Sequence, residues 1–340
     1  LTHSVDASVM LLLRRVARAA PLRHARTAAA PNPSNWAPLA AAAALLLSTQ
    51  ARTEEEELEN VVNWSGTHAC LCKVKTPESR KEAIRIVAEH ASRNERIRPV
   101  GGALSPNGLA FAEDGASLIN LALLDKVLNV DVEKRTVTVE AGCRVEQVLE
   151  ALEPHDLTLE NLASIAAQQV GGFVGAGAHG TGACLPPVDE HVLEMTVATP
   201  GKGVVTKRRG DADFHAFPCS LGLLGVTLTL TLRCVPKHLL RERTQVLTRP
   251  EVVRRPAELI QDNRHVRFMW IPFADAVVVV SNNPTFDGCL GAGQGYEPRH
   301  DLEYRLQPFR SLLKDVSGDD GEGLGFAELR DALLAVKPLD

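Results

Sequence analysis

The segment from Ala163 to Gly182 constrains the fold of this chain more than any other stretch. It contains no Asp, Glu, Lys or Arg, and it holds six glycines, at positions 171, 172, 175, 177, 180 and 182. Glycine lets a backbone approach a ligand closely and take positive φ, so this composition is typical of a loop around a bulky anionic ligand. The alternative is a flexible linker, and the apolar residues Val170, Phe173 and Val174 argue against it.

Part of this segment has the spacing of the dinucleotide-binding fingerprint G-x-G-x-x-G, at Gly175, Gly177 and Gly180. That fingerprint requires a strand before it and a helix after it. Here the sequence CLPP follows at positions 184–187, and two prolines cannot continue a helix interior. The spacing alone is therefore only weak support for a dinucleotide fold.

A second loop rich in small residues lies upstream, in the sequence RPVGGALSPNG at positions 98–108. A short predicted strand, Ile97 to Val100, runs into it. Backbone N–H groups in such a loop can donate to a pyrophosphate, because small side chains leave the amides accessible. The chain therefore carries two candidate loops for the same kind of ligand.

Hydrophobic periodicity predicts an α+β chain whose character changes after Pro236. Before that point, the predicted strands span residues 69–74, 97–100, 117–121, 127–132, 136–140, 193–199 and 226–235, and the predicted helices span 77–93 and 145–152. After it, the pattern predicts adjacent strands at 266–272 and 276–281, a loop at 282–300, and helices at 302–314 and 326–336.

Charge and cysteine content argue against two classes of function. The formal net charge is −5 and acidic residues outnumber basic ones after Glu54, so a nucleic-acid partner is not predicted. The seven cysteines lack the paired spacing of a zinc site, and no metal is predicted. Cys70 and Cys72 share one face of a predicted strand. We interpret the cysteines mostly as buried, reduced thiols.

The first 53 residues resemble a targeting sequence rather than a folded domain. Met10 to about Asn32 is rich in Arg and Ala and free of acid, which is typical of a mitochondrial transit peptide, and the alternative is a disordered basic tail. We expect residues 1–9 to be translated upstream sequence or a gene-model artefact. The apolar run from Trp36 to Leu47 is shorter than the roughly 20 residues of a membrane-spanning helix, although it allows membrane contact. The acidic run at 54–57 begins a solvated linker over 54–68.

Several longer motifs carry a family resemblance. They are RPVGGALSPNG (98–108), NLALLDKVLNVD (120–131), TLENLASI (158–165), GAHGTGACLPPVDE (177–190) and TPGKG (199–203). With these motifs the chain resembles the plant L-galactono-1,4-lactone dehydrogenases, a family of aldonolactone oxidoreductases within the vanillyl-alcohol-oxidase group. The sequence NWSGTH at 63–68 resembles the start of their folded domain. Its N-W-S part is also a formal glycosylation pattern, which has no meaning in a mitochondrial protein.

The resemblance implies an α+β fold, with a two-subdomain FAD-binding domain of the PCMH type over 69–236 and the start of an α+β cap domain over 237–340. It implies non-covalent FAD and the oxidation of L-galactono-1,4-lactone to L-ascorbate with cytochrome c as electron acceptor. It also implies a mitochondrial protein, on the inner membrane or on its intermembrane side. Two alternatives stay open: a non-catalytic factor that joins an assembly intermediate of respiratory complex I, and an oxygen-using oxidase of sugar lactones or alditols.

The resemblance also implies which residues contact FAD. The diphosphate would receive N–H groups from Val100, Gly101, Gly102, Ala103, Leu104 and Ser105. The path from adenine to isoalloxazine would be lined by Ala163, Ser164, Gly172, Gly177, Ala178, His179 and Gly180, and the ring site would be closed by Gly222, Gly225 and Val226. For His179, a core histidine that donates to a backbone carbonyl is an equal alternative.

Some positions depart from the family pattern. Leu104 stands where many relatives carry the histidine that bonds covalently to flavin, so the resemblance implies FAD without a covalent link. Ala103 replaces an expected glycine, and Cys184 replaces a basic residue. By resemblance, Ala163 would lie near the flavin and restrict oxygen, with a plain packing role as the alternative. The family's lactone-binding Glu-x-Arg element matches nothing in Leu239 to Asp340, so we assign no catalytic residue and expect this chain to be incomplete and not to turn over.

Overall fold

The computed structural model describes residues 57–285 and 325–335 of the chain. Its first sheet is four-stranded, with strand order β1-β2-β4-β3. Strands β2 and β3 both run parallel to β4, and β1 runs antiparallel to β2. Helix α3 connects β2 to β3, and Ser79 caps it by accepting a hydrogen bond from the Glu82 amide (3.2 Å). The elements are β1 (Glu59–Val62), β2 (Ala69–Lys75), α3 (Arg80–Ser92), β3 (Ile97–Val100) and β4 (Ser117–Asn120).

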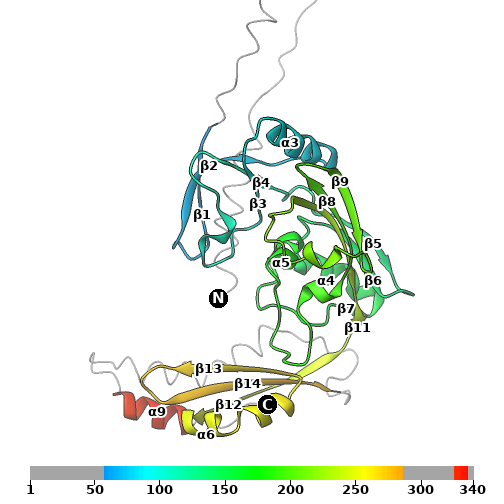
Figure 1. Cartoon of the computed structure of the whole chain (residues 1–340). Helices are drawn as coiled ribbons and strands as arrows, with labels where there is room; N and C mark the ends of the chain where they lie inside the picture. Colours follow the sequence, from blue (N-terminus) through cyan, green and yellow to red (C-terminus); the bar gives the residue numbers. More distant parts are fainter. Residues whose placement is uncertain (1–56, 286–324, 336–340) are drawn as a thin grey trace, which may run out of the picture. The chain divides into compact units, whose positions relative to one another are not determined.

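The second sheet is five-stranded and antiparallel, with order β5-β6-β10-β8-β9. Helix α5 packs against β6 and β10 at the centre of the sheet, while α4 packs against β5 and β6, and α3 against β8 and β9 (Figure 1). The elements are β5 (Val127–Asp131), β6 (Thr136–Glu140), α4 (Val145–Leu152), α5 (Val170–Gly175), β8 (Val192–Thr199), β9 (Gly203–Arg208) and β10 (Val226–Arg233).

The main hydrophobic core lies between this sheet and its helices. Strand β10 shows why: its sequence VTLTLTLR alternates apolar residues with threonines, and Val226, Leu228, Leu230 and Leu232 are all buried. An alternating pattern buries one face of a strand and leaves the other polar. On the polar side, the hydroxyls of Thr138 and Thr231 lie 2.9 Å apart across β6 and β10.

A three-stranded antiparallel sheet, of order β12-β14-β13, follows in the chain. Its central strand β14 is valine-rich and buried on both faces. Val278 and Val280 belong to a core with Leu333 of α9, whereas Val277 and Val279 belong to a core with Val252 of α6. The elements are β12 (Leu239–Thr248), α6 (Arg249–Arg254), α7 (Pro256–Gln261), β13 (His265–Ile271), β14 (Ala276–Thr285) and α9 (Phe326–Ala335).

Short elements complete the described ranges. Strands β7 (Leu157–Thr158) and β11 (Val235–Pro236) form a two-stranded pair, and one-turn 3-10 helices lie at 108–110, 153–155, 188–191 and 214–216. None of the helices within 57–285 and 325–335 combines the length and the apolar content needed to cross a bilayer.

The predicted α+β class is confirmed, and most predicted strands lie within one or two residues of the observed ones. Two predicted loops are wrong, since residues 170–175 form helix α5 and residues 282–285 belong to β14. Strand β1 lies within the predicted linker at 54–68, and strands β7, β9 and β12 and helices α6 and α7 were missed. The predicted transit peptide, the apolar run at 36–47 and the helix at 302–314 lie outside the described residues.

The cysteines agree in part with their prediction. All those in the described ranges are free thiols, and Cys70, Cys72, Cys143 and Cys234 are buried, whereas Cys184 and Cys219 are exposed. The Sγ atoms of Cys70 and Cys72 lie 3.5 Å apart on one face of β2, as the alternation predicts. Burial, together with the neighbouring Cys70 thiol, raises the pKa of Cys72 to about 12, so this thiol stays protonated.

Candidate functional site

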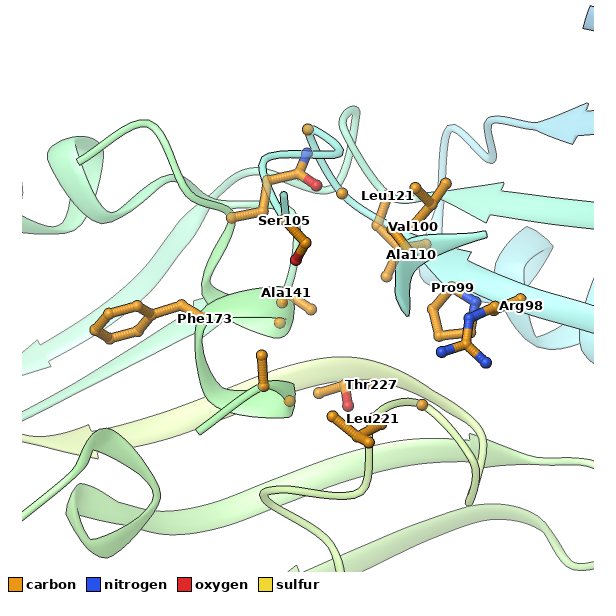
Figure 2. A pocket seen from close by; sticks show the side chains of 18 of the residues that line it. Arg98, Pro99, Val100, Ser105, Ala110, Leu121, Ala141, Phe173, Leu221 and Thr227 are labelled. Atoms are coloured by element: carbon orange, nitrogen blue, oxygen red, sulfur yellow. The ribbon is translucent and has the colours of Figure 1, made fainter. Parts of the chain in front are cut away.

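A pocket lies where the end of β3, the end of β4, helix α5 and the start of β10 meet. Figure 2 shows Arg98, Pro99 and Val100 on one side of it, Ala141 and Phe173 on another, and Leu221 with Thr227 on a third. Three segments supply most of its wall: the loop at 101–105 after β3, residues 168–176 around helix α5, and the loop at 220–225 before β10. Two of the three belong to the glycine-bearing stretches that the sequence singles out.

In the loop at 101–105 the amides are free, and two of the carbonyls accept hydrogen bonds. Across the described part of the chain, the backbone N–H groups of these residues donate no hydrogen bond. By contrast, the Ala103 carbonyl accepts from the Trp64 amide (3.1 Å), and the Ser105 carbonyl accepts from Nδ2 of Asn63 (3.0 Å). Ala103 takes φ +50, the left-handed region. Consecutive amides without an acceptor in a turn that enters positive φ form a site for an anion such as a phosphate.

The segment around α5 contributes three glycines to the pocket wall, Gly171, Gly172 and Gly175. A Cβ added at Gly172 or Gly175 would meet nothing within 4 Å, so both glycines leave open space beside the pocket. At Gly171 the reason for glycine differs, because an added Cβ would come within 3.0 Å of the Ala141 Cβ and 3.1 Å of its carbonyl oxygen. Gly171 therefore allows α5 to approach the end of β6, and Gly172 and Gly175 leave room for a ligand.

The third loop, at 220–225, contains three residues with positive φ. Leu221, Gly222 and Gly225 take φ of +53, +74 and +140. An added Cβ at Gly222 would lie 2.4 Å from Cγ of Pro99, and one at Gly225 would lie 2.2 Å from the Ala198 carbonyl oxygen. Both glycines therefore allow close contact between strands and loops on this side of the pocket, which a side chain would prevent.

The pocket is almost neutral. Arg98 is its one charged lining residue within the described ranges, and its Nε donates to the Leu109 carbonyl (2.9 Å). The other polar side chains are Ser105, Gln168, Gln169, Ser220 and Thr227, and the described lining contains no His, Cys, Tyr, Asp or Glu. No group of three or more potential metal ligands occurs in the described ranges. Such a wall suits a ligand that is held by backbone amides and apolar contact.

One thiol lies close to the pocket without lining it. Cys219 Sγ is 2.9 Å from where a Cβ on Gly177 would stand, next in sequence to the lining residue Ser220. Burial raises the pKa of the Cys219 thiol, and the nearby Asp189 carboxylate raises it further. The thiol is therefore protonated at neutral pH and is a poor nucleophile toward a bound ligand.

The structure brings together part of the predicted set of site residues. Those that line the pocket are Val100, Gly101, Gly102, Ala103, Leu104, Ser105, Gly172, Gly222 and Gly225. Those outside its lining are Ala163, Ser164, Gly177, Ala178, His179, Gly180 and Val226.

The residues outside the lining have other surroundings. Ala163 and Ala178 pack against the main core, and Val226 is buried in it. His179 is exposed, and its Nδ1 lies 2.9 Å from the Gly180 carbonyl oxygen. Its partner is thus a backbone carbonyl, as in the alternative interpretation, although the residue is not in the core.

Sequence reasoning missed several lining residues. They include Gln168, Gln169, Phe173, Ala141, Leu121 and Thr227. The two glutamines directly precede α5, and a consecutive pair of carboxamides beside a glycine run was the available signal. The side chain of Gln169 reaches the first loop, because a Cβ on Gly101 would lie 2.7 Å from its Oε1. The remaining residues come from strands and helix faces that carry no local motif.

Comparison with known proteins agrees with this geometry. A family model described as an FAD binding domain matches residues 73–207, and one described as D-arabinono-1,4-lactone oxidase matches residues 230–290. The chain is 42% identical over 302 residues to L-galactono-1,4-lactone dehydrogenase, mitochondrial, of Arabidopsis thaliana, an alignment that covers 84% of this chain and 49% of that protein. Residues 73–207 are thus an FAD-binding domain, and the chain is similar over most of its length to aldonolactone oxidoreductases.

More distant relatives extend the comparison. L-gulonolactone oxidase of Bos taurus is 33% identical over 226 residues, which covers 66% of this chain and 51% of that protein. The chain thus spans about half the length of the curated relatives it matches. Among solved structures, cholesterol oxidase from Brevibacterium sterolicum has a similar fold, with a TM-score of 0.59 at 20% identity, over 67% of this chain and 48% of that one.

Proposed function

We propose that the pocket binds FAD, with the amides of residues 101–105 donating to the diphosphate. The observation that carries this proposal is the loop itself, whose N–H groups have no protein acceptor within the described ranges while the carbonyls of Ala103 and Ser105 accept from other parts of the protein. Gly172 and Gly175 leave open space beside it, which a bulky ring system would fill. The amides would neutralise and orient the anionic part of the cofactor, and the apolar wall would exclude water.

The cofactor is held without a covalent bond. Leu104, which by resemblance stands where many relatives carry a histidine, lines the pocket, and the described lining offers no His, Cys or Tyr. A hydrocarbon side chain has no atom that can attack the flavin. FAD would therefore be retained by hydrogen bonds and burial alone.

For the whole protein we propose oxidation of L-galactono-1,4-lactone to L-ascorbate, with cytochrome c as electron acceptor. The family and the 42% identity to a named L-galactono-1,4-lactone dehydrogenase support this. FAD supplies the two-electron oxidation when bound. Residues 69–236 would form the FAD-binding domain, and the sheet after Pro236 would begin the cap over the substrate. Since the plant relatives are named mitochondrial, we propose a mitochondrial location at the inner membrane.

The test uses protein isolated from its own source with antibodies raised against residues 57–285. Precipitation in acid should leave the yellow colour in the supernatant, because no bond joins flavin to protein. Anaerobic L-galactono-1,4-lactone should bleach the flavin absorbance, and the reduced protein should then reduce cytochrome c. Colour in the pellet would refute the non-covalent site, and a bound flavin that the lactone never reduces would refute the proposed activity.

A further inference from the structure

The turn from Asn63 to His68 lines no part of the pocket, yet it contacts the loop that does. Its sequence, NWSGTH, connects β1 to β2. Contacts reach the pocket loop at the Ala103 and Ser105 carbonyls, and they reach the Pro106 carbonyl directly after it. The turn and the loop are about 40 residues apart in sequence, so this is a tertiary contact rather than a local turn.

Asn63 is the centre of this contact. Its side chain is buried, with 3% of the residue exposed. Oδ1 accepts from the amides of Thr67 (3.0 Å) and His68 (3.1 Å), and Nδ2 donates to the Thr67 hydroxyl (3.2 Å) and to the Ser105 carbonyl (3.0 Å). Every hydrogen-bonding position of the carboxamide is used, so the side chain has a single stable orientation.

Two further bonds complete the contact. The Thr67 hydroxyl donates to the Pro106 carbonyl (2.8 Å), and the Trp64 amide donates to the Ala103 carbonyl (3.1 Å). The second bond is accepted by Ala103, whose φ of +50 is a strained conformation for an L-residue. The turn thus holds the strained residue of the loop by its carbonyl.

These bonds have a consequence for the loop's amides. A backbone carbonyl that is fixed by a donor on one side also fixes the peptide plane, and with it the N–H of the next residue. The bond from the Trp64 amide to the Ala103 carbonyl therefore orients the N–H of Leu104. The residue after Ser105 is Pro106, which has no N–H, so the bond from Asn63 to the Ser105 carbonyl fixes the path of the chain at the end of the loop. Through its Oδ1, Asn63 also holds the turn that carries the Trp64 amide. Without the turn, the loop would be free to rotate its peptides and would lose its preorganised set of donors.

We propose that Asn63 and Thr67 are positioning residues for the diphosphate loop, which they orient from outside the pocket. The inference rests on the proposed role of residues 101–105 toward FAD. It gives a physical role to a motif that otherwise has only the form of a glycosylation pattern, and the burial of Asn63 removes its side chain from any such modification.

The test compares FAD with riboflavin, which lacks both phosphates. Each is titrated into the full chain, and binding is followed by flavin fluorescence. Asn63→Asp keeps the acceptor oxygen but loses the donor to Ser105, and it places a negative charge beside a carbonyl. We expect its Kd for FAD to rise about 10-fold or more and its Kd for riboflavin to stay unchanged. Thr67→Val removes one exposed hydroxyl without burying a charge, and about a threefold rise in Kd for FAD is expected.

The matched control is Asn263→Asp. Nδ2 of Asn263 also donates to a main-chain carbonyl, that of Leu259 (2.7 Å), but in α7 of the three-stranded sheet region. Its Kd for FAD should equal that of the wild type. If Asn63→Asp does not fold, Thr67→Val decides the question.

The possible outcomes distinguish the diphosphate role of the loop from the positioning role of Asn63 and Thr67. Equal affinity of the wild type for FAD and riboflavin would refute the diphosphate role of the loop, and the positioning role with it. A clear wild-type preference for FAD that both variants retain in full would refute only the positioning role. An equal loss of FAD and riboflavin affinity would also refute it, since that is the result expected of general damage to the fold.

Discussion

The two glycine-bearing segments of this protein use glycine for different purposes. In the loop at 101–105, every residue lines the pocket, and the backbone amides are free. In the segment at 163–182, only the part around α5 lines the pocket, while the glycines beyond it resolve close contacts within the protein. Gly180 is an example, since an added Cβ would lie 2.2 Å from Oδ1 of Asn161.

This difference shows that a high glycine count does not by itself identify ligand-binding residues, because some of the glycines are needed for close packing within the protein. Gly182 has the side chain of Leu185 2.6 Å from where its Cβ would be, and Gly177 has the Cys219 thiol. An added Cβ at Gly172 or Gly175 would have no protein atom within 4 Å. The same residue type therefore meets protein atoms at some positions of one segment and open space at others, and only the tertiary structure distinguishes them.

The strongest way to test this distinction is Gly180→Ala. The new methyl group would overlap Oδ1 of Asn161 and the Leu162 carbonyl, and Asn161 is buried with its Nδ2 bonded to the Pro186 carbonyl (3.1 Å). Overpacking of this kind costs about 2–3 kcal/mol, so the urea midpoint should fall clearly. A variant as stable as the wild type would mean that Gly180 is not a packing position.

A substitution at Gly172 in the same segment should change FAD affinity and leave stability almost unchanged. Gly172→Leu places a side chain in the open space at the pocket, so we expect stability within about 0.5 kcal/mol of the wild type and a Kd for FAD at least about 10-fold higher. Fluorescence titration and urea unfolding on the same sample measure both. Gly201→Leu, at another open glycine outside the pocket lining, is the control and should leave the Kd unchanged. Unchanged FAD affinity in Gly172→Leu would contradict the assignment of the pocket.

The smallest effect is expected in the other loop, at Ala103. Its φ of +50 is strained for alanine and unstrained for glycine, so Ala103→Gly should stabilise the fold by about 0.5–1 kcal/mol. Asn94→Gly serves as control, because Asn94 has a similar φ of +55 but asparagine tolerates it better. Thermal unfolding of the two variants compares them directly. A larger gain at Asn94 than at Ala103 would show that strain in the pocket loop is relieved by other means.

Much of the fold follows from periodicity, and the misses have physical reasons. The alternation in β10 and the apolar run in β14 predict strands because both patterns are strong. Helix α5 was missed because its sequence, VGGFVG, has poor helix propensity, and it is stabilised by packing Val170, Phe173 and Val174 into the core. Strand β12 was missed because LLRERTQVLT mixes charged residues into a strand that is largely exposed.

The site was less predictable than the fold. The loop at 101–105 was found because small residues follow a strand, which is a local signal. Ala141 and Thr227 could not be found, since they come from different elements and meet only through sheet order β6-β10 and the approach of α5. The departure of Ala103 from the family glycine has a structural counterpart in its positive φ. The roles given to Ala163 and His179 stay predictions.

The free amides of residues 101–105 also bear on how this family can diverge. Every amino acid except proline carries the same N–H, so the anion-binding capacity of the loop survives almost any substitution that keeps its path. Evolution is then free to exchange the side chains on that path one at a time. With FAD bound as we propose, the side chain at residue 104 can differ between relatives while the amides that donate to the phosphates stay in place.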